Sequence, residues 1–204
     1  MADTGRKRPA EILTKDEVRS LLAACSRRAP TGIRDRALLT VLYRAGLRIE
    51  EALDLKPGDV DPDRGTIRVL HGKGDHNRTV AVDDGAIAVL QLWVAERGRL
   101  GMNGRQKLFC TLTGSPLSTN QVRQMCKRRA ARAGIDKRVH PHGLRHTHAA
   151  ELVAEGVPVN VIQKQLGHVS LATTDVYLRH IAPADVIAMG RSRTWSAEPG
   201  AAAP

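Results

Sequence analysis

Hydrophobic residues recur along most of this chain at the three- and four-residue spacing of amphipathic helices. The first such segment follows Thr14, and Glu17 completes the capping-box pattern that marks a helix N-terminus. A second helix is predicted over RDRALLTVLYRAG, ending at Gly46, and a short third helix over RIEEALDL, closed by Pro57. The chain from Thr14 to Pro57 is therefore predicted to be mainly helical.

The hydrophobic period changes in the segment GTIRVLHGKGDHNRTVAV, where apolar and polar residues alternate around a glycine-rich centre. This pattern predicts a β-hairpin with Gly72, Lys73 and Gly74 near its turn. Helical spacing returns in DDGAIAVLQLWVAERGRL and in STNQVRQMCKRRAARAG, where Ser118 and Gln121 form a second capping-box pattern. The predicted fold class is mainly α-helical with a small antiparallel β-sheet (α+β).

The histidine-rich stretch near the C-terminus predicts further helices, because glycines that suit helix ends follow two of its apolar runs, at Gly156 and Gly167. These helices are expected at about 142–155, 158–167 and 171–178, with a shorter one at 184–189. The polar first residues and the tail SAEPGAAAP lack periodicity. We therefore expect one folded domain over residues 12–190, between a disordered basic N-terminus (1–11) and a disordered tail (191–204).

The charge balance points to a polyanionic partner. Lys and Arg number 32 against 21 Asp and Glu, a formal net charge of +11, which favours nucleic acid over a membrane surface. Aromatic residues make up only 2% of the chain, too few for base stacking of the kind that single-strand binders use. Contact of Arg and Lys with a DNA duplex backbone fits better.

The three cysteines are far apart and odd in number, so they match neither a disulfide framework nor a paired-cysteine zinc site. Buried or free thiols in a reducing compartment are expected. No segment resembles a signal peptide or a membrane span, so we expect a cytoplasmic protein without membrane contact.

His142 and His146 have the spacing of a metal-binding helix, but Arg145 lies in the turn between them. A guanidinium repels a divalent cation, so no metal is expected here. Arg145 lies in a helix that otherwise looks buried, and a buried arginine needs an anionic partner. These residues alone leave two interpretations open, a structural ion pair and a phosphate-binding site, and they favour the ion pair.

Four separated segments carry a more specific signal: AGLRIEEALDL, HGKGDHNRTVAV, HPHGLRHTHA and QLGHVSLATTDVY. In this order and spacing they resemble the catalytic motifs of the tyrosine recombinases of the phage integrase family. With the covering helices, the resemblance extends over about residues 12–190. The residues that match the family's catalytic positions are Arg48, Lys73, His142, Arg145, His168 and Tyr177.

The resemblance implies a transesterification at a DNA phosphodiester. Tyr177 would attack the scissile phosphate, form a 3′-phosphotyrosyl link and release a 5′-hydroxyl. A second 5′-hydroxyl would then reverse this step on another strand. Because the energy of the bond is retained, the resemblance implies no cofactor.

The other matched residues would assist that reaction. Arg48 and Arg145 would clamp the charged transition state, and His168 would add a hydrogen bond to the same oxygens. A free tyrosine, with a pKa of about 10, is almost fully protonated at neutral pH. His142 is therefore the candidate base, and Lys73 would protonate the leaving oxygen.

Other residues receive supporting roles. Tyr43 lies among leucines, which favours core packing or an interface over nucleophilic attack. Glu51 is expected to orient a basic side chain, and His146 to support the site. The residues expected to contact the DNA backbone are Lys127, Arg128, Arg129, Arg132 and Arg78, for which a solvated basic surface is the alternative.

The favoured function is a site-specific DNA recombinase that acts on double-stranded DNA. Assembly as a homo-oligomer, a synaptic tetramer on DNA, is one option, and the sequence leaves the oligomeric state open. The alternatives are a catalytically silent DNA-binding regulator of the same fold and a topoisomerase-like DNA-relaxing activity, with a metal-dependent hydrolase as a distant third. Members of the family usually carry an N-terminal helical core-binding domain. Here the catalytic segment starts near Ile12, which fits either a minimal recombinase or an excised domain.

Overall fold

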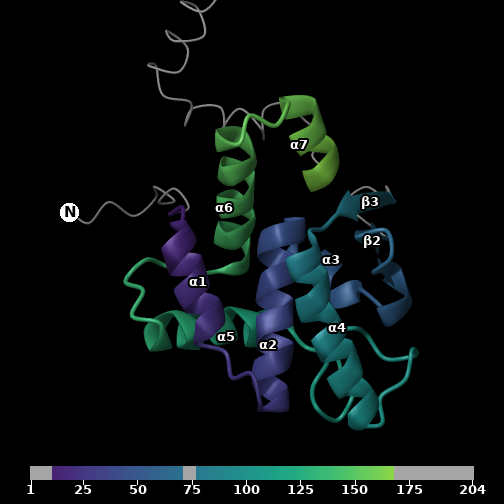
Figure 1. Ribbon diagram of the computed structural model, residues 1–204. Coiled ribbons are helices and arrows are strands. Elements are labelled where there is room, and N and C mark those ends of the chain that lie inside the picture. Colours follow the sequence, from purple (N-terminus) through teal and green to yellow (C-terminus); the bar gives the residue numbers. More distant parts are fainter. Residues whose placement is uncertain (1–10, 71–76, 168–204) are drawn as a thin grey trace, which may run out of the picture.

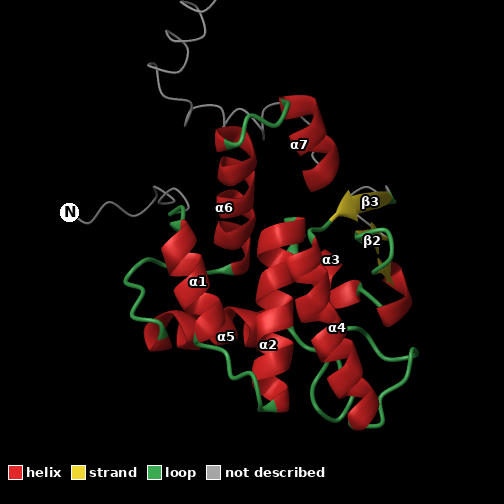
Figure 2. Ribbon diagram, in the orientation of Figure 1, coloured by secondary structure: helices red, strands yellow, loops and turns green. Residues whose placement is uncertain are grey.

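The computed structural model describes residues 11–70 and 77–167 (Figure 1). Within these ranges helices predominate and a small sheet lies at one edge (Figure 2), so the predicted fold class is confirmed. The helices are α1 (Lys15–Ala23), α2 (Pro30–Thr40), η1 (Val41–Ala45), α3 (Ile49–Asp54), η2 (Pro57–Asp59), α4 (Asp84–Arg99), α5 (Thr119–Arg132), α6 (Pro141–Ala154) and α7 (Val159–Leu166). The strands are β1 (Val60–Asp61), β2 (Thr66–Val69) and β3 (Arg78–Ala81).

Both predicted capping boxes are formed. The Thr14 hydroxyl accepts from the Glu17 amide at 3.1 Å, and the Thr14 amide donates to the Glu17 carboxylate at 2.7 Å. Ser118 and Gln121 make the same reciprocal pair at the start of α5, at 3.2 and 2.8 Å. These bonds satisfy amides that a helix leaves without intrahelical partners, so the residue pattern determines both helix starts locally.

The second predicted helix ends at Gly46 as expected, but its last turn is a π-helix, η1. Gly46 has φ +61°, in the left-handed region. A Cβ atom there would also lie 2.6 Å from His148 Cδ2 and 2.7 Å from Leu166 Cδ2. Glycine is therefore required at this position both by backbone conformation and by the close approach of α6 and α7.

The three strands form an antiparallel sheet in the order β1-β2-β3. The predicted hairpin is confirmed, with Ile67 opposite Val80 and Arg68 opposite Thr79. Ile67 and Val80 are buried, whereas Arg68 and Thr79 are exposed, as the alternating pattern requires. Strand β1 was not predicted, since two residues are too few for a periodic signal. The turn of the hairpin, including Lys73, lies outside the described residues.

A large hydrophobic core joins α1 to α6 and the sheet. Trp93 is fully buried in it, and its indole N–H donates to the Leu108 carbonyl at 2.8 Å. A smaller cluster, Ala149, Ile162 and Leu166, packs α7 against α6. These two helices stand together at one end of the molecule, with α7 also in contact with β3 (Figure 1).

All three cysteines are buried free thiols, as predicted. Within the described ranges, no helix combines the length and the apolar character that crossing a bilayer requires. The helices predicted at 171–178 and 184–189 lie outside those ranges. So do the termini predicted to be disordered, apart from Glu11, whose carboxylate accepts from the Arg138 amide at 2.9 Å.

Candidate active site

Arg145 is buried in α6, with 2% of its surface exposed. Its Nη1 donates to the carbonyl of Gly46, and its Nη2 donates to the carbonyl of Leu166 at 2.6 Å. Gly46 caps η1 and Leu166 is the last residue of α7, so both carbonyls belong to the partially negative ends of helices. The partial negative charge of these two helix C-termini has the sign that the predicted anionic partner would supply.

Arg48 approaches the same end of α7 from another direction. It is the N-cap of α3, and its Nη1 donates to Glu51 Oε1 at 2.8 Å. Its Nη2 donates to the carbonyl of Gly167 at 3.0 Å, one residue beyond the carbonyl that Arg145 binds. About a third of the Arg48 side chain, 30%, stays exposed. The fold therefore brings the two predicted catalytic arginines together.

Glu51 holds two arginines at once. Besides Arg48, it receives both terminal nitrogens of Arg78, at 2.9 and 2.7 Å. Burial raises the pKa of Glu51, but hydrogen bonds from Arg78 and from the Arg48 backbone outweigh this effect and lower the pKa to about 2. The prediction that Glu51 orients a basic side chain is confirmed, and Arg78 is the second side chain that it holds.

Gly167 ends α7 in the left-handed region, at φ +64°. A Cβ atom at this position would lie 2.9 Å from the guanidinium of Arg78. The end of α7 is therefore packed closely against Arg78, and a side chain at this position would strain the backbone and displace the guanidinium. The next residue in the chain is His168, which lies outside the described residues, as does Tyr177.

His142 and His146 lie on successive turns of α6, and their Nε2 atoms are 2.7 Å apart. One ring must donate and the other accept, so the two imidazoles cannot both be cationic in this contact. Partial burial, followed by the positive charges of Arg145, His140 and Arg48, holds the pKa of His142 below its usual value. His142 therefore favours the neutral form, which a general base needs.

His140 begins α6. Its Nδ1 accepts from the Gly143 amide at 3.0 Å, which is the role that Ser, Thr, Asp or Asn usually has at an N-cap. Its ring is stacked near His142, with ring centroids 6.5 Å apart. Sequence reasoning did not assign His140 to the site, because histidine is an uncommon N-cap residue.

A groove of about 650 Å³ leads away from His142. Its walls are the N-terminal end of α3, one face of α5 and the segment 135–140 that leads into α6. Its polar lining includes Asn120, Arg123, Gln124, Lys127 and Arg138. The groove joins the predicted catalytic histidine to a surface rich in hydrogen-bond donors.

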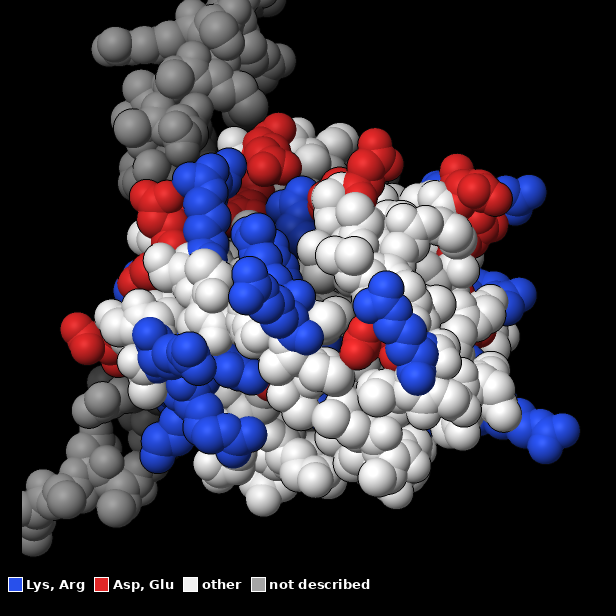
Figure 3. Space-filling view, turned by 60° about the horizontal axis from the view of Figure 1, so that its bottom comes forward, with Lys and Arg blue, Asp and Glu red and all other residues white. Residues whose placement is uncertain are grey.

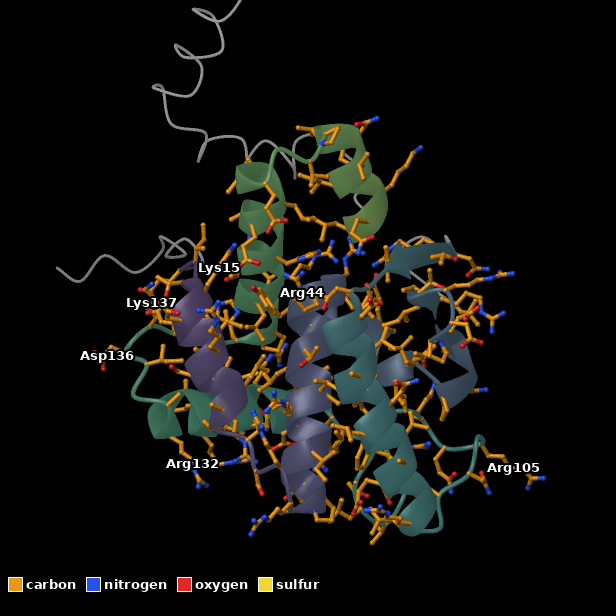
Figure 4. The ribbon with its side chains drawn as sticks, in the orientation of Figure 1. Lys15, Arg44, Arg105, Arg132, Asp136 and Lys137 are labelled. Atoms are coloured by element: carbon orange, nitrogen blue, oxygen red, sulfur yellow. The ribbon has the colours of Figure 1, made fainter. Side chains whose placement is uncertain are left out.

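The predicted DNA-contacting residues divide into two groups. Lys127, Arg128 and Arg132 are exposed on α5, on a molecule whose Lys and Arg side chains extend across the middle and lower left of Figure 3. In Figure 4 Arg132 points away from the fold. By contrast, the Nη2 of Arg129 donates to Asp35 at 2.7 Å and its Nη1 to the Ala24 carbonyl. The Arg129 and Arg78 guanidinium groups are thus engaged in internal contacts.

Tyr43 is buried, and its hydroxyl lies 2.6 Å from both carboxylate oxygens of Glu151. Burial, and then the hydrogen bond to Glu151, raise the pKa of Tyr43 to about 12. A buried phenol with so high a pKa is a poor nucleophile, so the packing role predicted for Tyr43 is confirmed.

Among the described residues, no group of three or more His, Cys, Asp or Glu side chains is arranged to hold a metal ion. His142 and His146 provide two nitrogens, and Arg145 adds a positive charge on the same helix.

The sequence of residues 11–182 matches the family model described as the phage integrase family. The chain belongs to the phage integrase family. All six predicted catalytic residues lie within the matched range, residues 11–182. The structure describes Arg48, His142 and Arg145, whereas Lys73, His168 and Tyr177 lie outside the described residues.

Individual tyrosine recombinases are also similar to the chain in sequence. The chain is 39% identical over 172 residues to the tyrosine recombinase XerC of Xylella fastidiosa strain 9a5c, covering 84% of this chain and 56% of that protein. It is 38% identical over 176 residues to the tyrosine recombinase XerD of Xanthomonas axonopodis pv. citri strain 306, covering 82% and 57%. The chain thus spans a little over half the length of these relatives.

Solved structures of integrase-family proteins share the fold. The crystal structure of the XerA recombinase superposes with a TM-score of 0.78 at 31% identity, covering 94% of this chain and 68% of that one. XerH, in a post-cleavage complex with its palindromic difH substrate, superposes with a TM-score of 0.72 at 28% identity, covering 90% and 53%.

The sequence did not predict the backbone carbonyls that hold the arginines of the site. The Gly46 and Leu166 carbonyls bind Arg145, yet a carbonyl acceptor leaves no residue-type signal. The bidentate pairing of Arg78 with Glu51 was missed as well, because the two residues are 27 positions apart on different elements. The sequence did indicate that helices end at Gly46 and Gly167, and these are the helix ends whose carbonyls bind Arg145 and Arg48.

Proposed function

We propose that this chain is the catalytic part of a site-specific tyrosine recombinase, which cleaves and rejoins double-stranded DNA through a 3′-phosphotyrosyl intermediate. The observation that carries the proposal is the convergence of Arg48 and Arg145 on the last two carbonyls before His168. Two fixed cations beside a neutral histidine suit a phosphate whose negative charge grows in the transition state. The proposed catalytic domain covers residues 12–190.

Each residue has a defined task in the proposed reaction. Tyr177 attacks the scissile phosphate, and its proton passes to His142, which the lowered pKa keeps neutral and therefore free to accept a proton. Arg48, Arg145 and His168 stabilise the charge on the non-bridging oxygens. Lys73 protonates the departing 5′-oxygen, and the reverse attack of a 5′-hydroxyl restores the phosphodiester and the free tyrosine.

Arg48 and Arg145 differ in solvent exposure, and this difference suits them to different roles at the phosphate. Arg145 is buried and bound to two carbonyls, which supports a role in fixing the phosphate site rigidly. Arg48 is partly exposed, so its guanidinium can exchange a contact for a phosphate oxygen without breaking the core. Glu51 keeps Arg48 in place while that exchange happens.

The proposed DNA surface is the groove beside His142 together with the exposed face of α5. Lys127 lines the groove, and Arg128 and Arg132 follow on the same helix. These side chains would neutralise backbone phosphates and position the duplex. Arg78 and Arg129, by contrast, would act through Glu51 and Asp35 as supports of the fold.

The proposal extends to assembly and cellular location. XerH is a recombinase whose structure was solved on its DNA substrate, and we propose that this chain likewise acts on DNA as a homo-oligomer, with a synaptic tetramer as the active form. An enzyme of this kind acts where the DNA is, in the cytoplasm, and its mechanism calls for no cofactor.

A nicked suicide duplex tests the proposal, because loss of the short strand after cleavage traps the covalent intermediate. The wild-type protein should form a protein–DNA adduct that resists denaturation, and Tyr177→Phe should form none. Tyr43→Phe is the matched control, and it should retain the adduct. Without an adduct from the wild type, or with an equal yield from Tyr177→Phe, the proposal fails.

A further inference from the structure

A second pocket, of about 320 Å³, lies between the loop after α1, the middle of α2 and the part of α4 from Val89 to Arg99. Ile33, Val89 and Leu92 are among its apolar lining residues. Leu92 lies at the rim of the pocket, with 64% of its surface exposed. The lower ends of α2 and α4 in Figure 1 lie on the side of the molecule that is turned toward the viewer in Figure 3. The groove beside His142 shares none of this pocket's lining.

Three arginines, Arg27, Arg36 and Arg99, line the same pocket. Arg36 is half-buried, and its Nη1 is fully buried without a hydrogen-bond partner among the described residues. Burial, and then the nearby charge of Arg27, lower the pKa of Arg36. Because Nη1 is sealed from solvent, a ligand in the pocket would reach Arg36 through its other guanidinium nitrogens.

The neighbouring acids do not neutralise Arg36. Asp35 points its carboxylate to Arg34 and Arg129, at 2.7 Å in each case. Glu96 lines the pocket but makes its ion pair with Arg99, at 3.4 Å. The pocket therefore has an excess of positive charge over an apolar floor.

We propose that this pocket docks a segment of a partner protein in which a carboxylate stands beside apolar side chains. The carboxylate would bind Arg27 and the guanidinium nitrogens of Arg36 other than the buried Nη1, since a planar guanidinium pairs with a carboxylate through two hydrogen bonds. The apolar side chains would cover Ile33, Val89 and Leu92. A DNA phosphate would satisfy the charge but leave these apolar surfaces exposed, and this difference selects a protein segment over DNA.

The docking surface is independent of the recombinase chemistry, so its test does not require cleavage. The probe is a short synthetic peptide that alternates glutamate with leucine, titrated into the full chain while the methyl NMR signals of Ile33, Val89 and Leu92 are followed. These methyl signals should shift together and saturate. The same peptide with glutamine in place of glutamate should bind at least about tenfold more weakly, because it loses a charge-assisted hydrogen bond.

Arg36→Gln should weaken binding of the glutamate peptide by a similar factor, about tenfold. The matched control is Arg105→Gln, which removes the same charge from an exposed side chain that points outward in Figure 4. This control should change binding less than about twofold. Arg36→Leu should leave the Tm unchanged or raise it, because a cation that serves only docking destabilises the free protein.

Three results would overturn the docking surface. The first is that the methyl signals do not respond to the peptide. The second is that the wild type and Arg36→Gln bind the peptide equally well. The third is that duplex DNA, and not the peptide, shifts these methyl signals. A lower Tm in Arg36→Leu together with unchanged peptide binding would also refute it, by showing that Arg36 serves folding.

Discussion

Arg48 and Arg145 donate to adjacent carbonyls, those of Gly167 and Leu166, at the C-terminal end of α7. One arginine comes from the start of α3 and the other from the middle of α6. The last turn of a helix carries partial negative charge, so it attracts both guanidinium groups and partly offsets their mutual repulsion. The pair is thus organised by backbone that directly precedes His168 in the chain.

Replacing Arg145 should affect stability and activity together. Arg145→Lys cannot reach the carbonyls of Gly46 and Leu166 at once, because an ammonium lacks the planar fork of a guanidinium. We expect a loss of about 1–3 kcal/mol in the free energy of unfolding in urea, together with loss of the covalent DNA adduct. Arg48→Lys, at a partly exposed position, should lose the adduct with a smaller change in stability. Equal destabilisation by the two variants would contradict this.

Glu51 should make the protein sensitive to acid. Its pKa is about 2 in the folded protein, against an ordinary value of 4.5. A lowered carboxyl pKa contributes stability that is complete above the ordinary value and is lost as the pH falls toward about 2. Glu51→Gln should be less stable at neutral pH by about 3 kcal/mol, since it leaves Arg48 and Arg78 without their counter-charge. Chemical denaturation at a series of pH values should show a flatter acid slope for the variant; a slope equal to that of the wild type would refute this account.

His142 should set the acid side of the pH–rate profile of cleavage. Burial and the charges of Arg145, His140 and Arg48 lower its pKa, so cleavage should persist below pH 6.5, the ordinary pKa of histidine, before it falls. His142→Gln should reduce the rate about 10²-fold and remove the acid limb. His146→Gln should keep the acid limb while lowering the rate, because His146 contacts the base and does not itself take the proton. Single-turnover cleavage measured over a range of pH gives the rate and the acid limb of each variant. If the acid limb persists in His142→Gln, another residue is the base.

Gly46→Ala should destabilise the site more than the same change at another left-handed glycine. Both Gly46 and Gly134 have positive φ, +61° and +66°. At Gly134 an added Cβ meets nothing within 4 Å, whereas at Gly46 it lies 2.6 Å from the ring of His148. We expect about 1 kcal/mol for Gly134→Ala from backbone strain alone, and at least about 2 kcal/mol for Gly46→Ala. Thermal unfolding compares the two variants. Equal losses of stability would show that His148 and α6 can move aside to accommodate the added methyl group.

The arginines of α5 should separate by function. Arg128→Gln and Arg132→Gln should each weaken duplex binding and reduce the slope of log affinity against log salt by about 0.9, with little change in Tm. Arg129→Gln should lower the Tm, because it breaks the ion pair with Asp35, and should leave the salt slope nearly unchanged. Fluorescence anisotropy at several salt concentrations measures the slopes. A reduced slope in Arg129→Gln would place that side chain on DNA instead.

Much of this protein follows from local sequence alone. Thr14 with Glu17, and Ser118 with Gln121, determine helix starts because the capping partners are three residues apart. The alternation across GTIRVLHGKGDHNRTVAV determines the hairpin, since a strand exposes every second side chain. The order of the catalytic motifs likewise belongs to the sequence.

Tertiary structure decided how the site is held. The acceptors of Arg145 are backbone carbonyls, which every residue type carries, so no pattern of letters distinguishes Gly46 and Leu166 as its partners. Only packing shows that Arg129 faces Asp35 while Arg128 and Arg132, on the same basic helix, face solvent. Sequence spacing determines which side chains share a helix face, but the partner that a face meets depends on chain segments many residues away.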